Sequence, residues 1–476
     1  MRIPRTPPDV FETLESETRD VLFRRLGDPD VADFVRRAND GYIHWDKLRY
    51  RPLPDGFDDQ MSWAAVWMSR FQQYQPIPIR FKAGDQLKYW NPPQHLDWLH
   101  RIDQQAGGVL GSASPIHVGA ENHERYLINA LMEEAIASSQ LEGAVTARRV
   151  AKQMLREGRR PKNRAERMVF NNYSAILKIR DCKSDDLTVA LLKELHSVVT
   201  NDTLEDSAGE GHFRAADDKV VVEDAYTHDV LHTPPSAASV EERIEEICSF
   251  ANQRSKPFIH PVTKAIILHF ALGYVHAFVD GNGRTARAVF YWFMLKHGYW
   301  LFEFLPISRL FLRAPVKYAR SYLYTESDDG DLTYFIHYNL WVILRAIKDF
   351  HGYLVNQQEK ISEAGKLLRS APDLNHRQQS LISHALRHPD ANYTIQEHQG
   401  THRVCYATAR ADLIQLADAG YLTLVRRKNR TLFSPHVELL RQLRKASGLT
   451  GMPPRKTKTV PQVAVTRLRA TDQETS

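Results

Sequence analysis

Residues 276–287, HAFVDGNGRTAR, combine side chains that bind phosphate with side chains that move protons. Gly281 and Gly283 flank Asn282 where one apolar segment gives way to another, and glycines let a ligand approach the backbone closely. If a helix begins near Asn282, its free N–H groups favour an anion, above all phosphate. Arg284 and Arg287 are three residues apart and share a helix face. Two arginines beside such an anion hole suit a polyphosphate.

The same segment carries a carboxylate and a histidine. Asp280 would oppose an anion unless it holds a cation, and a carboxylate beside phosphates is a typical Mg²⁺ ligand. His276 can accept a proton from an attacking hydroxyl near neutral pH. The alternative is a buried loop with a satisfied histidine and salt-bridged arginines. The coincidence of six polar identities between two apolar segments favours transfer of a phosphorus group from a nucleotide.

Two buried helices are predicted to position this segment. Residues 260–278 begin with Pro261 at a helix N1 position and are apolar nearly all round, as in a helix at the centre of a bundle. Residues 286–298 have the same character, and Gly298 is the predicted stop. Residues 122–143 and 165–179 also show helical spacing. We therefore expect a mainly α-helical fold around the motif.

Composition and charge set broad limits. The chain has 476 residues, a formal charge of +6 and three cysteines. The length predicts two to four domains, and the mild basic excess allows phosphate-bearing partners without indicating DNA. The cysteines match no metal site or disulfide framework, which favours a reducing cytoplasmic location. Neither a signal peptide nor a membrane span is expected, so no membrane partner is predicted.

The predicted organisation has four parts. Residues 1–115 read as an aromatic-rich region of short helices and irregular segments, with tryptophans that form a local core. Residues 116–365 form the motif-bearing core. Residues 366–440 read as helix, short helix, turn, helix and two strands, the layout of a small α+β winged helix-turn-helix domain. Residues 441–476 are basic and Pro-interrupted, and we expect this tail to be largely disordered.

The motif resembles the signature of the Fic (Fido) family, HxFx(D/E)GNGRxxR. Its defining positions are filled by His276, Phe278, Asp280, Gly281, Asn282, Gly283, Arg284 and Arg287. Ala277 stands where the family usually has proline, which shapes only the turn. The resemblance covers roughly residues 120–350. It implies a helical bundle with a β-hairpin flap that transfers AMP from ATP to a protein hydroxyl.

The resemblance also implies roles for the motif residues. His276 would be the general base, Asp280 would hold Mg²⁺ between the α- and β-phosphates, and Phe278 would anchor the loop. Arg284 would steady the phosphates and Arg287 would reach the γ-phosphate. The implied nucleotide-binding set is Asp280, Gly281, Asn282, Gly283, Arg284, Thr285, Ala286 and Arg287, with Asn282 and the glycine backbone in the anion hole.

Two further segments resemble parts of the family. Gly211, Phe213 and Arg214, followed by the valines Val220, Val221 and Val222, are similar to the flap that pairs with the acceptor's main chain. An ordinary edge strand is the alternative for the valines. Tyr318 and Tyr322 are candidates to close over adenine, and core packing is the alternative for both.

Residues 138–143, SSQLEG, resemble the family's inhibitory motif (S/T)xxxE(G/N). Ser138 and Glu142 are four residues apart and share a helix face, and Gly143 follows. By this resemblance an inhibitory helix spans about 125–145, and Glu142 pairs with Arg287. Such a pair would occupy the arginine that should hold the γ-phosphate.

Competing functions stay open at this point. The main interpretation is an autoinhibited protein adenylyltransferase (nucleotidyltransferase) that uses ATP and Mg²⁺ and modifies a Ser, Thr or Tyr hydroxyl, its own included. One alternative is a nucleotide-sensing, DNA-binding regulator whose Fic core is a switch, and another is a transferase with a different nucleotide donor. A homodimer is an open alternative for assembly.

DNA contacts in the winged helix would come from Thr401, Arg403, Tyr406, Thr408 and Arg410, and from the wing residues Arg426, Arg427, Lys428 and Arg430. Protein docking is the alternative use of that domain.

Overall fold

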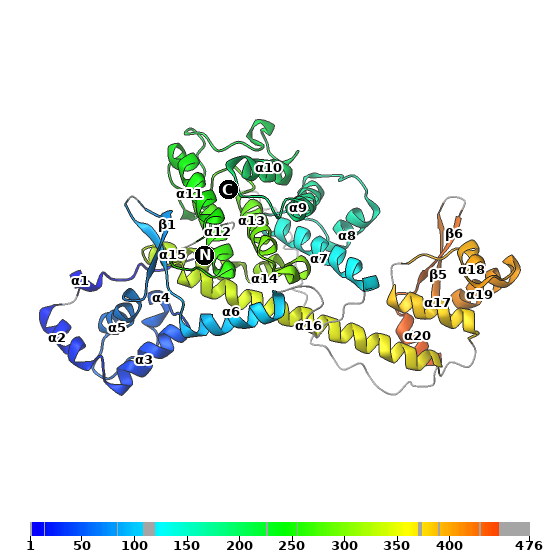
Figure 1. The fold of residues 1–476 in the computed structure, drawn as a ribbon, viewed down its shortest axis with the longest axis horizontal. Helices are drawn as coiled ribbons and strands as arrows, with labels where there is room; N and C mark the ends of the chain where they lie inside the picture. The colour runs from blue at the N-terminus through cyan, green and yellow to red at the C-terminus, as the bar shows by residue number, and fades with distance from the viewer. Residues whose placement is uncertain are drawn as a thin grey trace, which may run out of the picture. The chain divides into compact units, whose positions relative to one another are not determined.

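The computed structural model describes residues 2–13, 15–82, 84–107, 120–224, 227–254, 256–369, 374–388, 391–427 and 430–446. It is mainly helical, as predicted, and the strands within these ranges form three two-stranded antiparallel sheets. The chain divides into two compact units, 1–350 and 351–476. The boundary falls between residues 350 and 351, inside the long helix α16 (Thr333–Arg369), whereas the sequence suggested a border at residue 365 (Figure 1).

Helices α12 (Pro261–Val275) and α13 (Asn282–Lys296) form the centre of the first unit (Figure 1). Pro261 occupies the predicted N-terminal position of α12, and Gly298 adopts a left-handed φ of 81° just after α13. Both helices are apolar around their circumference, so they need cover on every side. The helices that supply it are α7 (Ala120–Leu141), α9 (Arg164–Asp181), α10 (Val189–Thr200) and α11 (Val240–Asn252).

Shorter elements complete this core. They are α8 (Arg148–Glu157), α14 (Ser308–Arg313), α15 (Pro315–Ser327), and the 3₁₀ turns Ser207–Gly209, Ala237–Ser239 and Trp300–Phe304. The predicted flap is a short hairpin of β3 (Val222–Glu223) and β4 (Val230–His232), with Val222 opposite His232. Val220 and Val221 precede the strand, so only Val222 of the three predicted valines belongs to it.

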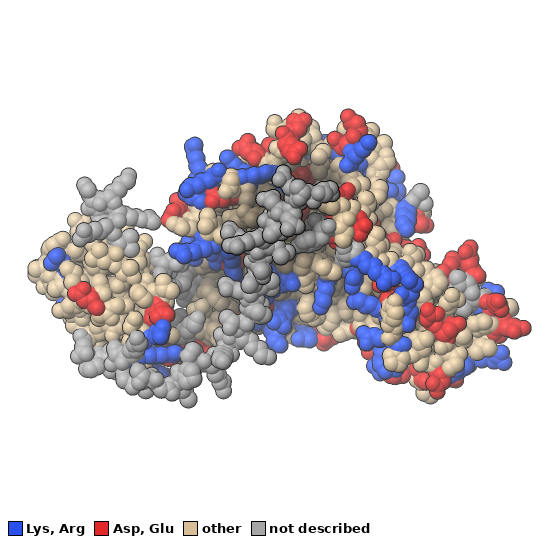
Figure 2. Space-filling view, turned by 180° about the vertical axis from the view of Figure 1, so that it is seen from behind, with Lys and Arg blue, Asp and Glu red and all other residues tan. Residues whose placement is uncertain are grey.

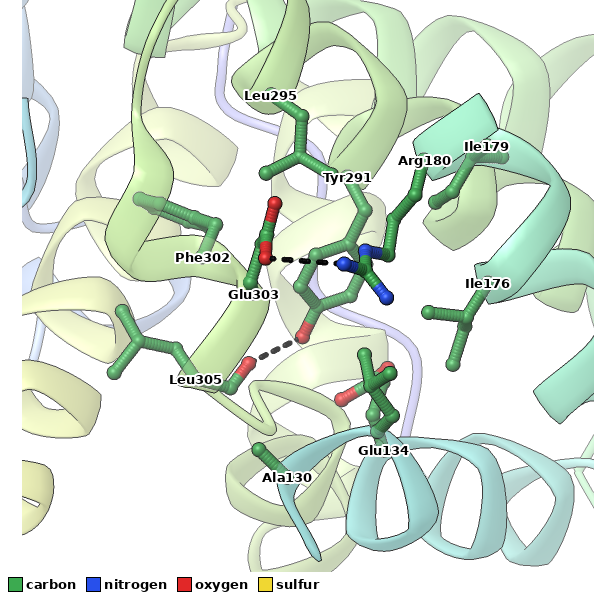
Figure 3. A pocket seen from close by; sticks show the side chains of 11 residues that line it. Ala130, Glu134, Ile176, Ile179, Arg180, Tyr291, Leu295, Phe302, Glu303 and Leu305 are labelled. Carbon is green, nitrogen blue, oxygen red and sulfur yellow. Dashed lines mark hydrogen bonds and ion pairs between the residues drawn. The ribbon is translucent and has the colours of Figure 1, made fainter. Parts of the chain in front are cut away.

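The predicted inhibitory helix has different bounds from those expected. Helix α7 ends at Leu141, so Glu142 and Gly143 lie in the following turn, where Gly143 has a φ of 83°. Two turns before the end of α7, the buried carboxylate of Glu134 accepts a hydrogen bond from the Ser308 backbone N–H at 2.9 Å. Figure 3 shows Glu134 beside a cavity of about 10 Å³, which is too small for a ligand. This contact fixes α7 against the start of α14.

Residues 10–71 form a lobe with its own small core, whereas the buried side chains between residues 77 and 106 belong to the main core. The predicted short helices are present as α1 (Val10–Thr13), α2 (Ser16–Arg25), α3 (Pro29–Asp40), α4 (Trp45–Leu48), α5 (Asp59–Phe71) and α6 (Pro93–Ala106). A hairpin of β1 (Gln75–Arg80) and β2 (Gln86–Tyr89) was not predicted. Proline is confined to sheet edges, and Pro76 and Pro78 are both exposed on β1 while Ile77 and Ile79 are buried.

A buried polar network attaches this lobe to the core. Arg70, which is fully buried, donates to the Tyr334 hydroxyl at 2.8 Å and to Asn39 at 2.9 Å. The Tyr42 hydroxyl donates to the buried carboxylate of Asp331 at 2.6 Å. A buried charge that loses its partners is strongly destabilising, so these bonds hold the lobe in one position on the core.

The second unit contains α17 (His376–Arg387), α18 (Ile395–His402), α19 (Tyr406–Asp418), β5 (Leu422–Arg427), β6 (Arg430–Pro435) and α20 (Leu439–Ala446). The order of three helices and a hairpin agrees with the sequence. The expected disordered tail starts too early, because residues 441–446 belong to α20, where Leu443 is fully buried. Residues 447–476 lie outside the described residues, as do Lys428 and the side chains of Arg426, Arg427 and Arg430.

Across the ranges that the structure describes, none of the helices combines the length and the apolar character needed to cross a membrane.

Candidate active site

The motif loop leaves α12 through His276, which adopts a left-handed backbone with φ 48° and ψ 56°. This conformation is strained for a residue other than glycine, so surrounding bonds must hold it. The His276 N–H donates to the Leu272 carbonyl at 3.1 Å. Arg214 donates from its side chain to the His276 carbonyl and from its backbone N–H to Ala277, both at 2.9 Å. The root of the flap therefore holds the start of the loop.

The imidazole of His276 is oriented to act as a base. Its Nδ1 lies 3.0 Å from the Gly273 carbonyl, which can only accept, so Nδ1 carries the proton and Nε2 keeps a lone pair. Burial lowers the pKa of His276 below its usual 6.5, and the neighbouring Gly273 bond offsets this only in part. A neutral imidazole with a free Nε2 can accept a proton at pH 7.

The centre of the loop is closed by Asn282. Its side-chain oxygen accepts from the Phe278 N–H at 2.9 Å, and its amide donates to the Phe278 carbonyl at 2.7 Å. The side chain therefore braces the loop in this conformation, whereas the resemblance placed Asn282 in the anion hole. Gly281 has a φ of 81°, and a Cβ there would come within 2.6 Å of Thr200 Cγ2. Only glycine fits that position.

His196 on α10 clamps this loop, and sequence reasoning did not single it out. Its ring accepts from the Gly211 N–H at 3.0 Å and donates to the Asp280 carbonyl at 2.8 Å. The ring also stacks on Phe278 with centroids 3.7 Å apart and an angle of 4°. Burial lowers the pKa of His196 to about 4, so the ring is neutral and can accept and donate at once. The only sequence signal was a histidine within an apolar helix, which is usually structural.

The first turn of α13 forms a cradle for an anion. Its leading N–H groups have no acceptor within the helix, and Gly281 provides no side-chain cap. Arg284 is fully buried and donates to the Val199 carbonyl at 3.0 Å. Its other two nitrogens have no hydrogen-bond partner among the described residues, and burial lowers its pKa. A buried guanidinium with free donors beside a helix N-terminus suits phosphate oxygens.

Asp280 stands at the edge of the cradle. Its side chain is 39% exposed and lies 3.4 Å from Arg164 and 3.6 Å from Arg284. No group of three or more His, Cys, Asp or Glu side chains in the described ranges could hold a metal by itself. A single carboxylate beside a phosphate cradle fits Mg²⁺, which keeps waters and substrate oxygens as its other ligands.

Arg287 is bound by the turn that follows α7. The guanidinium is 4% exposed, and it donates to Ser138 Oγ at 2.9 Å, to the Ser138 carbonyl at 3.0 Å and to Glu142 Oε1 at 2.8 Å. Burial is the largest single influence on Arg287 and lowers its pKa, but the charge and hydrogen bond of Glu142, together with Tyr318 and Glu134, raise the pKa overall. The structure thus contains the pair of Glu142 and Arg287 that the resemblance implied, and it adds the bonds to Ser138.

The Glu142 carboxylate also lies directly at the N-terminus of α13. A Cβ added to Gly283 would collide with Glu142 Oε1 and lie 3.0 Å from an Arg287 nitrogen. Negative charge is favoured at a helix N-terminus. Glu142 therefore occupies a position in the cradle that a phosphate oxygen could also take. Both anions would be stabilised there by the N-terminus of α13 and by the guanidinium of Arg287.

Tyr318 and Tyr322 lie in the core side by side. The Tyr318 hydroxyl is 2.9 Å from His269 Nε2, and its ring stacks on Phe311 with centroids 4.3 Å apart. The Tyr322 ring contacts Phe335 at a centroid distance of 4.5 Å. Core packing describes both side chains in this conformation, and a contact with adenine stays a prediction.

Residues 186–294 match the Fic/DOC family. The match includes α10, the flap, α12 and the motif loop, and it ends within α13. The chain is 30% identical over 133 residues to "Protein adenylyltransferase fic-1" of Caenorhabditis elegans, covering 28% of this chain and 25% of that protein. It is 28% identical over 117 residues to "Protein adenylyltransferase Fic" of Nematostella vectensis, covering 25% of each. The chain thus spans about a quarter of the length of these curated relatives.

Two solved structures are similar as well. A Fic family protein from Desulfovibrio desulfuricans G20 has a TM-score of 0.46 and 16% identity, covering 72% of this chain and 95% of that one. Fic-1 from Caenorhabditis elegans has a TM-score of 0.47 and 18% identity, covering 73% of this chain and 91% of that one.

We expect the clamp by His196 to govern nucleotide affinity. His196→Phe preserves the stacking on Phe278 but removes both hydrogen bonds, so the loop loosens and ATP affinity falls by roughly tenfold, the effect of about 1.4 kcal/mol. His196→Gln, whose amide can donate and accept hydrogen bonds, should retain most of the ATP affinity that His196→Phe loses. Calorimetric titration with ATP measures both variants, in the Glu142→Gly background so that the cradle is free. Equal affinities for the Phe and Gln variants would contradict the hydrogen-bonded clamp.

Proposed function

We propose that this chain is a protein adenylyltransferase that transfers AMP from ATP to a hydroxyl side chain of a protein. The observation that carries the proposal is the free Nε2 of a neutral His276 beside the phosphate cradle of α13. The match of residues 186–294 to the Fic/DOC family supports it, as do the names of the curated relatives. Alignment of a base with a bound polyphosphate is what in-line phosphoryl-group transfer requires.

The proposed step balances around the α-phosphorus. The acceptor oxygen attacks this atom while its proton passes to His276 Nε2, and the bond from the α-phosphorus to the bridging oxygen breaks. AMP stays on the acceptor, and pyrophosphate leaves with the electron pair of the broken bond. The backbone N–H groups of α13 and the free nitrogens of Arg284 stabilise the charge on the phosphates. Asp280 would hold Mg²⁺, which neutralises phosphate charge when bound.

The acceptor is proposed to dock on the flap by main-chain pairing. Strand β3 begins at Val222, and β4 is held by His232, whose ring contacts the Tyr274 carbonyl at 2.8 Å. Tyr274 is two residues before His276, so a segment on the flap lies near the base. The chain itself is one candidate acceptor. The cradle contacts the phosphates of a nucleotide and not its nucleobase. Transfer from a nucleotide other than ATP is therefore the alternative reaction.

We further propose that the described conformation is autoinhibited. Glu142 holds Arg287 at 2.8 Å and places its carboxylate at the cradle. The γ-phosphate would need the same guanidinium, and two anions cannot share it without strong repulsion. ATP would then bind without the γ-phosphate in place, and its α-phosphorus would not be aligned for attack.

Removal of the Glu142 carboxylate should activate the enzyme. Glu142→Gly frees Arg287, and we expect AMP incorporation to rise roughly 5- to 150-fold, as for a coupling of 1–3 kcal/mol. Intact mass after incubation with ATP, UTP, GTP and CTP measures the transfer and identifies the donor. Gln140→Gly is the matched control, because Gln140 bonds to Thr146 in the same region instead of Arg287. A folded, nucleotide-bound Glu142→Gly variant with no gain would refute the inhibition.

Loss of the base should stop transfer but leave binding. In the Glu142→Gly background, His276→Ala is expected to lower AMP incorporation by roughly 10²–10⁴-fold, the usual contribution of a general base, with ATP affinity largely retained. Only the neutral imidazole can accept a proton, and burial lowers its pKa. The midpoint of the decline in activity with falling pH should therefore lie below pH 6.5. Self-modification that is unchanged in His276→Ala would exclude this role.

A second candidate function is DNA binding by the C-terminal unit. Helix α19 exposes Tyr406 and Arg410 near its start, and the exposed Arg403 is the C-cap of the preceding helix α18. Thr401 is exposed as well, whereas Thr408 is half-buried. These side chains would face a groove if α19 were a recognition helix. The basic side chains of the wing, Arg426, Arg427, Lys428 and Arg430, lie outside the described residues.

DNA binding predicts a salt-dependent mobility shift. Mixed duplex DNA should bind the full chain at low salt, with an affinity that falls steeply as salt rises because phosphate contacts release counterions. Arg403→Ala with Arg410→Ala should weaken it about tenfold or more. The absence of any shift at low salt would instead favour protein docking by this unit.

A further inference from the structure

Two elements that are far apart in the sequence share one surface of the first unit. Helix α4 contributes His44, its N-cap, whose ring stacks on Tyr324 of α15 with centroids 4.3 Å apart. Ser327 Oγ lies 3.2 Å from His44 Nε2, and Lys47 Nζ lies 5.6 Å from the centroid of the Tyr324 ring. The contacts place the cations of α4 beside those of α15.

The shared surface carries what we call the cationic patch: Lys47, Arg49, Arg51, Lys317 and Arg320. None of them forms an ion pair with any residue that the structure describes, whereas Arg80, for example, pairs with both Glu242 and Glu246. Burial, and then the charges of Arg320, Lys317 and Arg51, lower the pKa of Lys47, and the nearby Asp46 offsets this only in part. Figure 2 shows Lys and Arg side chains gathered where the N-terminal helices meet the core.

The patch has donors available for an anion. Lys317, Arg320 and Tyr324 are three and four residues apart on α15, which places them along one face. Among the described residues, the Nε atoms of Arg49 and Arg320 have no hydrogen-bond partner, and the Tyr324 hydroxyl lies beside the guanidinium of Arg320. Unpaired cations repel one another, and an anionic partner would remove this repulsion and satisfy the donors.

The patch lies on the helix that holds the flap. Glu326 of α15 accepts from His232 of β4 at 2.6 Å. Arg320 is six residues before Glu326, a distance of about 9 Å along a helix. An extended chain covers that distance in roughly three residues. A protein segment paired with the flap could therefore place its next few side chains against the cationic patch.

We propose that the cationic patch on α4 and α15 recognises an acidic segment of the acceptor protein, close in sequence to the part that lies on the flap. This inference rests on the proposed adenylyltransferase function. Single-stranded nucleic acid is the less favoured partner, because it binds largely by stacking on open rings. Here the ring of Tyr324 already contacts His44 and Lys47.

The test measures binding of a labelled peptide of about a dozen residues, rich in glutamate, to the full chain by fluorescence anisotropy at low salt. Lys317→Glu with Arg320→Glu should weaken binding by about tenfold or more, since like charges across an interface repel. Arg149→Glu with Lys183→Glu is the matched control, because both residues are exposed on other elements and the charge change is identical. Lys317→Gln with Arg320→Gln provides a milder variant in case the reversal disturbs folding, which tryptophan fluorescence reports.

Each outcome decides the proposal. Selective weakening in the patch variants supports it. Equal weakening in the control, no change, or no binding by the wild type overturns it. Tighter binding of a labelled oligo-thymidine than of the peptide, lost in the patch variants, overturns it in favour of nucleic acid. AMP incorporation by Glu142→Gly, measured separately, tells the two proposals apart: incorporation without patch-dependent peptide binding refutes only the acidic docking surface, and no incorporation refutes the transferase.

Discussion

A guanidinium buried as deeply as that of Arg287 needs an anion next to it, and the arrangement of the site follows from this need. Arg287 lies on α13, which is buried around its whole circumference, so water cannot take the place of a partner. Glu142 fills the requirement at 2.8 Å, and Ser138 accepts the remaining hydrogen bonds. The same electrostatic demand suits a phosphate, and this makes the arginine a point where an internal carboxylate and an external ligand compete.

The loop between α12 and α13 has a second constraint, since it must present polar groups while its own backbone stays satisfied inside an apolar core. Asn282 closes the loop on Phe278, His196 bonds its centre to α10, and Arg214 bonds its start to the flap root. The side chains of Asn282, His196 and Arg214 are thus engaged in holding the loop, and other side chains are available to contact a ligand. The groups left to act are His276 Nε2, two nitrogens of Arg284 without a hydrogen bond among the described residues, and Asp280, which lies 3.4 Å from Arg164 and 3.6 Å from Arg284. Twelve residues can contain both structural and reactive groups because helices α12 and α13 fix the two ends of the loop.

Local patterns in the sequence predicted much of this arrangement. Pro261, Gly281 and Gly298 stand at helix boundaries, where a fixed φ or a positive φ is needed, and the structure has the boundaries there. The apolar periodicity identified α12 and α13 as buried helices. Other features could not be predicted from local pattern. The β1 hairpin contains two prolines that are tolerated only because they are exposed at an edge. The role of His196 depends on Gly211 and Asp280, which are 15 and 84 residues away along the chain.

The sequence by itself determined which residues are chemically able to act, because side-chain type and helical spacing are local properties. It indicated a base, a metal ligand, a phosphate cradle and an acidic residue capable of pairing with arginine. Only the tertiary structure decided which contact each group makes in this conformation. Glu142 and Arg287 are 145 residues apart, and they meet because α7 packs against α13. The side chain of Asn282 braces the loop, and of the two uses left open for Tyr318 this conformation shows packing against the core. Long-range packing settles such questions, since every buried polar group takes the partners that the assembled helices bring to it.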